Sequence, residues 1–259
     1  MIHKAKFILL LTSILTCVFA ASADQPIGGI ITEDITLSVP SDFATIQEAL
    51  DWIDARTISN KAIVDIQIED GTYNNYQTIV IDLTYGKQVH IIGNPSNPGN
   101  VVINFSDSTN GISLTNGNVL GKMEGITLNA GAIPGSSTGI IATKNATFIG
   151  SNLVINGFYR GVLCQWEACI EIPNSDIKNS IYMGIDAWGA TILATNSSVT
   201  GGGNNGVYAH ANSQILINNG TVTGNSGTSL YAIQCSYILA SGTTIDNKYA
   251  SANSEISHP

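Results

Sequence analysis

The sequence is poor in charged side chains. Only 11% of its 259 residues are Asp, Glu, Lys or Arg, whereas 44% are hydrophobic. Disordered chains combine low hydrophobicity with high charge, so this composition indicates a folded protein. The 10 basic residues are outnumbered by 19 acidic ones, which gives a formal net charge of −9. An acidic surface repels nucleic acids and anionic lipids, so we expect neither as a partner.

Long apolar runs are also missing, apart from one near the N-terminus. Residues 7–19 are apolar but too few to span a bilayer. A short basic stretch precedes this run and Ala21-Ser22-Ala23 follows it, which is the pattern of a secretory signal peptide. We therefore predict a signal peptide at residues 1–23 and a secreted protein, extracellular or periplasmic, with no membrane association after cleavage. A lipoprotein anchored through Cys17 is the alternative.

Cysteine is scarce and its number is wrong for a disulfide framework. Three of the four cysteines follow the predicted signal peptide, namely Cys164, Cys169 and Cys235. An odd number does not form a set of intramolecular pairs, so we expect buried free thiols. No Cys or His pair has the spacing of metal ligands, and the acidic residues are scattered. We therefore expect no cofactor; a Ca²⁺ ion would be compatible with such a protein, but no motif supports one.

Glycine is abundant, with 26 residues, and it marks an internal repeat. Related segments recur about every 22 residues, which is the signature of a solenoid built from stacked coils. Each segment holds about three short strands in which apolar and polar residues alternate. The segments begin at Gly111, Gly139, Gly161, Gly184, Gly206 and Ser229.

Alignment of the segments produces columns of similar residues. The apolar columns predict side chains stacked inside the solenoid, because no single coil can bury its own apolar face. An asparagine column formed by Asn152, Asn174, Asn196 and Asn219 predicts a turn with left-handed backbone and a ladder of side-chain hydrogen bonds. The apolar columns are Ile140, Val162, Ile185, Val207 and Leu230; Ala142, Cys164, Ala187, Ala209 and Ala232; Phe148, Ile170, Ile192, Ile215 and Ile238; and Ile155, Ile177, Val199, Val222 and Ile245.

A helix is expected before the repeats. Thr45 and Glu48 have the spacing of a capping box, and Ile46, Leu50 and Ile53 form an apolar stripe. We predict a capping helix at residues 45–56 that closes the N-terminal end of the core. The expected organisation is a cap with the first coils at 24–100, the β-helix at 101–250 and a tail at 251–259.

These features resemble the pectin-lyase-like superfamily. The segment SDFATIQEALDWI, then AIVDIQIEDGTYNN, the coils of about 22 residues and the asparagine column carry the resemblance. It implies an all-β protein, a single-stranded right-handed parallel β-helix with an N-terminal capping helix. The superfamily holds lyases, hydrolases, esterases, epimerases, tailspikes and adhesins. The catalytic signatures of its esterases and polygalacturonases are absent here, so the resemblance transfers no catalytic residue.

Candidate catalytic residues come instead from the columns that face outward. Asp186 and His210 lie one coil apart, about 4.8 Å along the axis, and a carboxylate can orient a histidine that acts as general base. Glu167 and Asp186 are the alternative, as acid and base on a glycosidic bond. Arg160 is a further candidate, as the proton-abstracting base of a lyase. None of these roles follows from a motif.

The same face is rich in aromatic side chains that suit a sugar. Aromatic rings stack on pyranose rings while polar groups bind hydroxyls in a pre-formed groove. We therefore predict a secreted protein that binds a polysaccharide and, as an enzyme, would cleave it by lyase or glycoside hydrolase chemistry. The alternative is a non-catalytic exported solenoid such as an adhesin, a tailspike-like protein or a structural protein. The candidate binding residues are Trp188, Tyr208, Tyr231, Gln165 and Trp166.

A second outward column is apolar. Leu193, Leu216 and Leu239 recur at equivalent positions of successive coils, next to inward-facing residues. One interpretation is a stripe covered by a loop or by the C-terminal tail. The other is a surface through which copies of the chain associate, giving a homo-oligomer.

Overall fold

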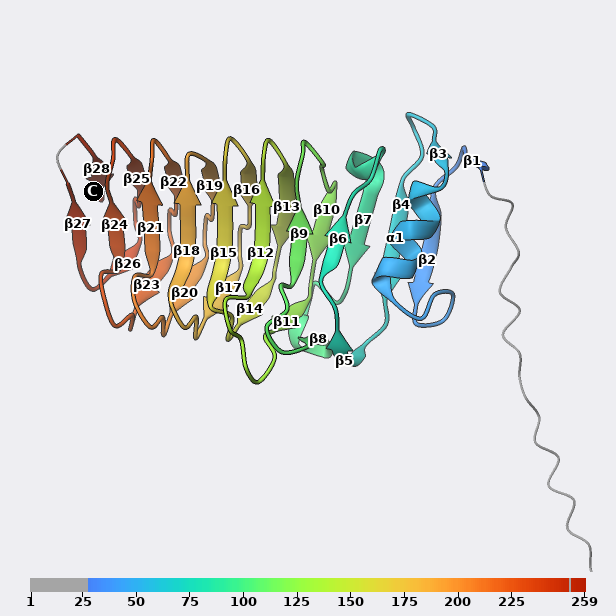
Figure 1. Cartoon of the computed structure of the whole chain (residues 1–259), viewed down its shortest axis with the longest axis horizontal. Helices are drawn as coiled ribbons and strands as arrows, with labels where there is room; N and C mark the ends of the chain where they lie inside the picture. The colour runs from blue at the N-terminus through green and yellow to red at the C-terminus, as the bar shows by residue number, and fades with distance from the viewer. Residues whose placement is uncertain (1–27, 252) are drawn as a thin grey trace, which may run out of the picture.

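The computed structural model describes residues 28–251 and 253–259, and these residues form a right-handed parallel β-helix (Figure 1). The chain rises along one sheet, turns, descends along a second and crosses to the next coil along a third. The predicted signal peptide at 1–23 lies outside the described residues. In the part of the chain that is described, no helix is both long and apolar enough to cross a membrane.

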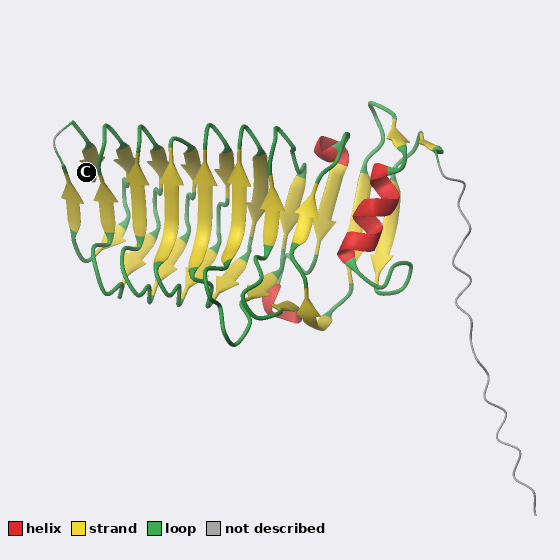
Figure 2. Ribbon diagram, viewed as in Figure 1, coloured by secondary structure: helices red, strands yellow, loops and turns green. Residues whose placement is uncertain are grey.

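Three sheets run the length of the solenoid, and every pairing between their strands is parallel (Figure 2). We name the ten-stranded sheet the long sheet, and the two eight-stranded sheets the front sheet and the ladder sheet. The long sheet contains β2 (Ile35–Val39), β4 (Val64–Ile68), β7 (Val89–Ile92), β10 (Lys122–Glu124), β13 (Thr147–Ser151), β16 (Cys169–Glu171), β19 (Thr191–Leu193), β22 (Gln214–Leu216), β25 (Tyr237–Leu239) and β28 (Glu255–Ser257).

The front sheet and the ladder sheet have eight strands each. The front sheet contains β6 (Ile79–Ile81), β9 (Ile112–Leu114), β12 (Thr138–Thr143), β15 (Arg160–Gln165), β18 (Met183–Trp188), β21 (Val207–His210), β24 (Leu230–Ala232) and β27 (Lys248–Ala250). The ladder sheet contains β5 (Gly71–Tyr76), β8 (Val101–Phe105), β11 (Thr127–Asn129), β14 (Val154–Asn156), β17 (Asp176–Lys178), β20 (Ser198–Thr200), β23 (Thr221–Thr223) and β26 (Thr244–Ile245). The short strands β1 (Ile30–Ile31) and β3 (Thr57–Ile58) pair near the N-terminal cap, and the 3₁₀ turns are η1 (Gly86–Gln88) and η2 (Pro98–Asn100).

The predicted inward columns form the core. Val162 pairs with Ile185, and Cys164 with Ala187, so equivalent residues of successive coils lie directly above one another. The same register continues from Ile185 to Val207. Almost all members of the four columns are fully buried. The prediction of stacked apolar columns is therefore confirmed.

The N-terminal end of this core is closed by helix α1 (Ile46–Asp54). Thr45 is its N-cap, and the Thr45 hydroxyl accepts a hydrogen bond of 3.2 Å from the Glu48 N–H. The Glu48 carboxylate accepts in return from the N–H of Ala44, one residue earlier than in the usual capping box. Ile46 and Leu50 are buried against the first coil, as predicted from the apolar stripe.

The predicted asparagine column forms its turn but only one rung of a ladder. Asn152, Asn174, Asn196 and Asn219 have left-handed backbone throughout, and the Asn196 amide donates to the Asn174 carbonyl at 3.1 Å. A longer asparagine ladder was not predicted. Its amides donate from each residue to the previous one at 2.7–3.0 Å along Asn74, Asn104, Asn129, Asn156 and Asn179. Its sequence spacings vary from 23 to 30 residues, so no fixed period reveals it.

The C-terminal segment is not a separate tail. Residues 251–259, which the sequence suggests lie beyond the solenoid, include β28. This strand pairs with β25 and adds the tenth strand to the long sheet. Ile256 of β28 packs against the core at the position equivalent to Ile238.

The five-residue ladder provides a test of how much lateral hydrogen bonding stabilises the solenoid. Asn156 has two ladder bonds, whereas Asn74 has one because it ends the ladder. We expect Asn156→Ala to lower the free energy of unfolding by about 2 kcal/mol and Asn74→Ala by about 1 kcal/mol. Urea unfolding followed by circular dichroism measures both. Equal losses would contradict a contribution from the ladder bonds themselves.

Candidate functional site

The outer face of the front sheet gathers most of the predicted site residues. In-register pairing sets Asp186 beside Tyr208, and Tyr208 beside Tyr231. It likewise sets Gln165 beside Trp188, and Trp188 beside His210. Strands β15, β18, β21 and β24 thus present two neighbouring outward columns, as the alignment of the repeated segments predicts.

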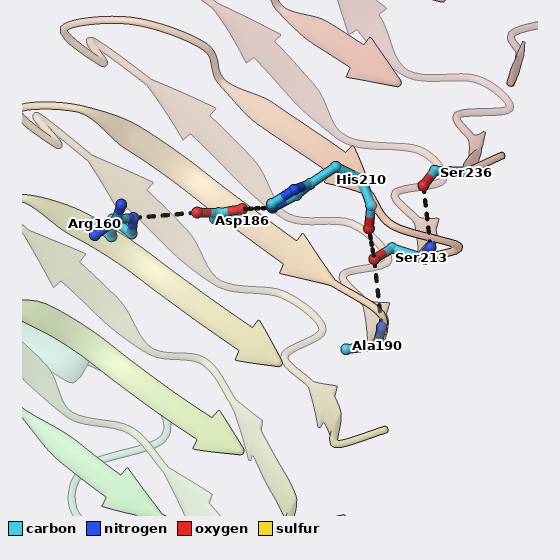
Figure 3. Close-up of polar contacts among 6 residues, drawn as sticks. All are labelled: Arg160, Asp186, Ala190, His210, Ser213 and Ser236. Atoms are coloured by element: carbon cyan, nitrogen blue, oxygen red, sulfur yellow. Dashed lines mark hydrogen bonds and ion pairs between the residues drawn. The ribbon is translucent and has the colours of Figure 1, made fainter. Parts of the chain in front are cut away.

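Asp186 lies at the centre of an ion-pair network (Figure 3). Its Oδ2 accepts a hydrogen bond from Arg160 Nε at 3.1 Å, and its Oδ1 accepts from His210 Nε2 at 3.0 Å. Asp186 itself is only 5% exposed. A buried carboxylate needs such partners, because burial of an unpaired charge is costly. Since both oxygens are engaged, this carboxylate is poorly placed to exchange a proton with a substrate.

Arg160 is held from a second side by tyrosines. Its guanidinium lies 5.2 Å from the ring centroid of Tyr159 and 5.4 Å from that of Tyr182. The two tyrosine rings stack at 5.2 Å with an interplanar angle of 18°. Cation–π contacts and the Asp186 ion pair together account for the position of Arg160. The arginine therefore supports the network rather than standing free as a base.

Aromatic rings form a column along the front sheet. His210 stacks on Tyr208 at 4.5 Å and on Trp188 at 5.4 Å, and Tyr231 stacks on Tyr249 at 4.9 Å. Tyr208 and Tyr231 are 5.3 Å apart at an angle of 48°. Tyr208 and Tyr231 thus each contact two rings, which cover the faces that the sequence-based hypothesis offered to a sugar. Burial raises the pKa of the Tyr208 phenol, and the Asp186 carboxylate raises it further.

The most accessible of the predicted binding residues lie at one edge of this face. Trp166 is 49% exposed and Trp188 is 44% exposed. Their ring centroids are 6.4 Å apart and the rings are inclined by 50°, so they do not cover each other as a parallel stack does. Both indoles lie at the corner where the front sheet turns toward the long sheet. The tryptophans are thus the predicted binding residues with the most open surface.

A column of turn residues explains why this corner is hollow. Backbone hydrogen bonds put Lys144, Trp166, Gly189, Ala211 and Gln234 at equivalent positions of five successive coils. All five have left-handed backbone, with φ between 55° and 58°. The turn at Gly189 is also one residue shorter than the turns of the adjacent coils, with two residues between β18 and β19 where β15–β16 and β21–β22 have three. Gly189 and Ala211 leave a gap between the larger residues on either side.

Two shallow depressions follow this corner and share Trp188 and Ala211. We name the continuous feature the corner groove. Asp186 lines neither depression, so the structure does not bring it together with Glu167 in one site. The corner groove is lined by Lys144, Asn145, Trp166, Glu167, Trp188, Gly189, His210, Ala211, Asn212, Gln234 and Cys235.

The thiols and the acidic residues do not add a metal or a disulfide to the site. Cys164 is buried as expected and burial strongly raises the pKa of its thiol, whereas Cys169 is half-buried. Cys235 is exposed at the corner groove, so the expectation that it is buried was wrong, because its turn points away from the core. Within residues 28–251 and 253–259, no cluster of three His, Cys, Asp or Glu side chains has the arrangement to hold a metal ion.

The apolar column on the long sheet faces outward. Leu193 pairs with Leu216, and Leu216 with Leu239. Each leucine is half-buried, because neighbours in the column cover part of one another. The C-terminal residues do not cover this stripe, since β28 continues the sheet and places Ser257 next to Leu239.

Comparison with known proteins returns no relative. No protein-family model, curated protein or solved structure matches this chain. The parallel β-helix is thus seen directly in the strand pairing, and the chemistry of the site rests on its own residues.

The role of Asp186 can be tested without any ligand. We expect Asp186→Ala to lower the free energy of unfolding by about 2–3 kcal/mol at pH 7, because it removes two charge-assisted hydrogen bonds from a buried position. Glu167→Ala is the matched acidic control, since Glu167 is exposed in the groove. Chemical denaturation measures both variants. Equal stability of Asp186→Ala and the wild type would show that the network contributes nothing.

Proposed function

We propose that this protein binds a neutral polysaccharide in the corner groove without cleaving it. The observation that carries the proposal is the pair of half-exposed indoles, Trp166 and Trp188, on adjacent coils beside the gap at Gly189 and Ala211. Exposed aromatic clusters mark interaction sites more often than scattered apolar residues do. Indoles with polar groups around them suit the apolar faces and the hydroxyls of a sugar chain.

Polar groups around the indoles match a ligand that carries hydroxyls but no charge. Asn145, Asn212 and Gln234 supply amides that both donate and accept hydrogen bonds. Lys144 and Glu167 carry opposite charges, so the groove has no strong charge of one sign. The acidic chain, at −9, also repels polyanionic glycans. These features favour a neutral polysaccharide.

Binding is better supported than cleavage. Asp186 is buried and holds both Arg160 and His210, so it lacks the free oxygen that a general acid or base presents to substrate. Glu167 lies at the groove without a second carboxylate among its lining residues. Hydrolysis of a glycosidic bond normally uses two carboxyl groups across that bond.

The remaining elements of the proposal concern origin and location. The parallel β-helix, its capping helix and the asparagine ladders support kinship with the pectin-lyase-like superfamily. The signal peptide predicted at residues 1–23 would bring the protein to a compartment where polysaccharides occur. Self-association through Leu193, Leu216 and Leu239 is compatible with this function, because that stripe lies on another sheet.

Binding should depend on the two tryptophans and on the gap between the larger turn residues. We expect Trp166→Ala and Trp188→Ala each to weaken binding about tenfold or more, because each removes an indole that the ligand covers. Ala211→Gln should weaken it similarly by filling the gap. Its backbone already has the conformation of Gln234, so the fold tolerates it. Calorimetry with cellohexaose, xylohexaose, mannohexaose and laminarihexaose measures these affinities.

Tyr249→Ala is the control, because Tyr249 is 50% exposed but lies outside the corner groove. It should bind like the wild type. Assays for new reducing ends and unsaturated products should remain blank. Normal affinity in both tryptophan variants would remove the groove as the binding site, and turnover would overturn the non-catalytic proposal.

The direction of the groove predicts how affinity depends on ligand length. The lining residues extend from the coil of Asn145 to the coil of Gln234, four coil steps or roughly 19 Å along the axis. We expect affinity to rise from disaccharide to hexasaccharide. Asn145→Ala and Gln234→Ala should weaken hexasaccharide binding and leave disaccharide binding unchanged. Affinity that is independent of length would contradict a ligand that lies along the solenoid axis.

A further inference from the structure

His210 occupies a position between two rings and a carboxylate. Its imidazole lies 5.4 Å from the Trp188 ring at 29° and 4.5 Å from the Tyr208 ring at 14°. Its Nε2 is bound to Asp186 Oδ1 at 3.0 Å. One side of Trp188 therefore rests on the imidazole. The indole lines both depressions of the corner groove and His210 lines one of them, so His210 supports the indole from beside it in the groove wall.

The backbone of His210 is anchored as firmly as its ring (Figure 3). The Ser213 hydroxyl donates to the His210 carbonyl, and accepts from the Ala190 N–H at 3.3 Å. The Ser213 N–H donates in turn to the Ser236 hydroxyl at 3.1 Å. This chain of bonds crosses three coils and fixes where the imidazole can lie. The fold thus holds the imidazole in place, and what can change is whether the ring is protonated.

We infer that His210 is a positioning residue whose protonated ring clamps the Trp188 indole in the corner groove. The consequence for ligand binding rests on the proposed function; the clamp itself does not. Histidine is the side chain that commonly changes charge between about pH 5 and pH 8. A protonated ring gains cation–π attraction to Trp188 and Tyr208 and a charged hydrogen bond to Asp186. The neutral ring can still donate Nε2–H to the Asp186 carboxylate, but it lacks the cation–π attraction and the full ion pair.

The charges around His210 set the sign of the effect. Asp186 on β18 is the anion that a protonated ring pairs with, and Arg160 on β15 is bound to the other Asp186 oxygen. The remaining titratable groups nearby are Tyr208 on β21, Tyr231 on β24, Cys235 after β24 and Glu167 after β15. Because the clamp needs a protonated ring, it is stronger at low pH than at high pH.

The fluorescence of Trp188 tests the clamp without a ligand. In a Trp52→Phe/Trp166→Phe variant only Trp188 of the three tryptophans remains. Protonated imidazole quenches indole emission on contact, so we expect emission to fall about twofold between pH 8 and pH 5. His210→Phe in the same background keeps a stacked ring but cannot titrate, and it should remove the transition.

Binding provides the second measurement. Affinity for the four neutral hexasaccharides should be about threefold higher at pH 5 than at pH 8 in the wild type, and independent of pH in His210→Phe. Emission from Trp188 that does not change with pH, or a transition that persists in His210→Phe, would overturn the inference even if sugars bind. A normal transition without binding of any sugar would leave the clamp in place and overturn the proposed function instead.

Discussion

Parallel, in-register pairing between coils is the constraint on which the whole molecule depends. A coil of about 22 residues cannot bury its own apolar face, so it is stabilised by its contacts with the neighbouring coils. Residues that must lie directly above one another, such as Val162, Ile185 and Val207, are consequently almost identical. Asparagine ladders add lateral hydrogen bonds at two corners of the coil, where the backbone turns sharply between sheets.

The requirement for stacked core residues does not limit the side chains at the outward positions. The equivalent turn residues Lys144, Trp166, Gly189, Ala211 and Gln234 all have left-handed backbone, so the solenoid tolerates a large side chain, a small one or none at that corner. Small side chains and a turn that is one residue shorter at Gly189 thus form a hollow without any change in the strand pairing. Arg160, Asp186 and His210 illustrate the complementary case, in which outward side chains hold one another in place. Binding surface and supporting network are therefore built from neighbouring columns of one sheet.

Much of the fold could be predicted, because apolar residues that repeat about every 22 residues are buried when the coils stack in register. The left-handed turns at Asn174 and Asn196 and the cap at Thr45 were predicted from local residue preferences. The ladder through Asn129 and Asn156 was not, since coils of unequal length hide its alignment. The alignment of the coils also predicted which residues share the outer face of the front sheet, but not how they contact one another. Asp186 is a buried anchor, and the faces of Tyr208 are covered by its neighbours.

The sequence by itself determined the architecture and the face on which to look, because local alternation and coil spacing depend only on residue order. Tertiary structure alone decided what that face can do. Whether a carboxylate is free or paired depends on which side chains reach it from other coils, as Arg160 and His210 reach Asp186. Whether an indole is open depends on its neighbours in space, and Trp166 and Trp188 stay exposed because Gly189 and Ala211 leave the corner beside them unfilled.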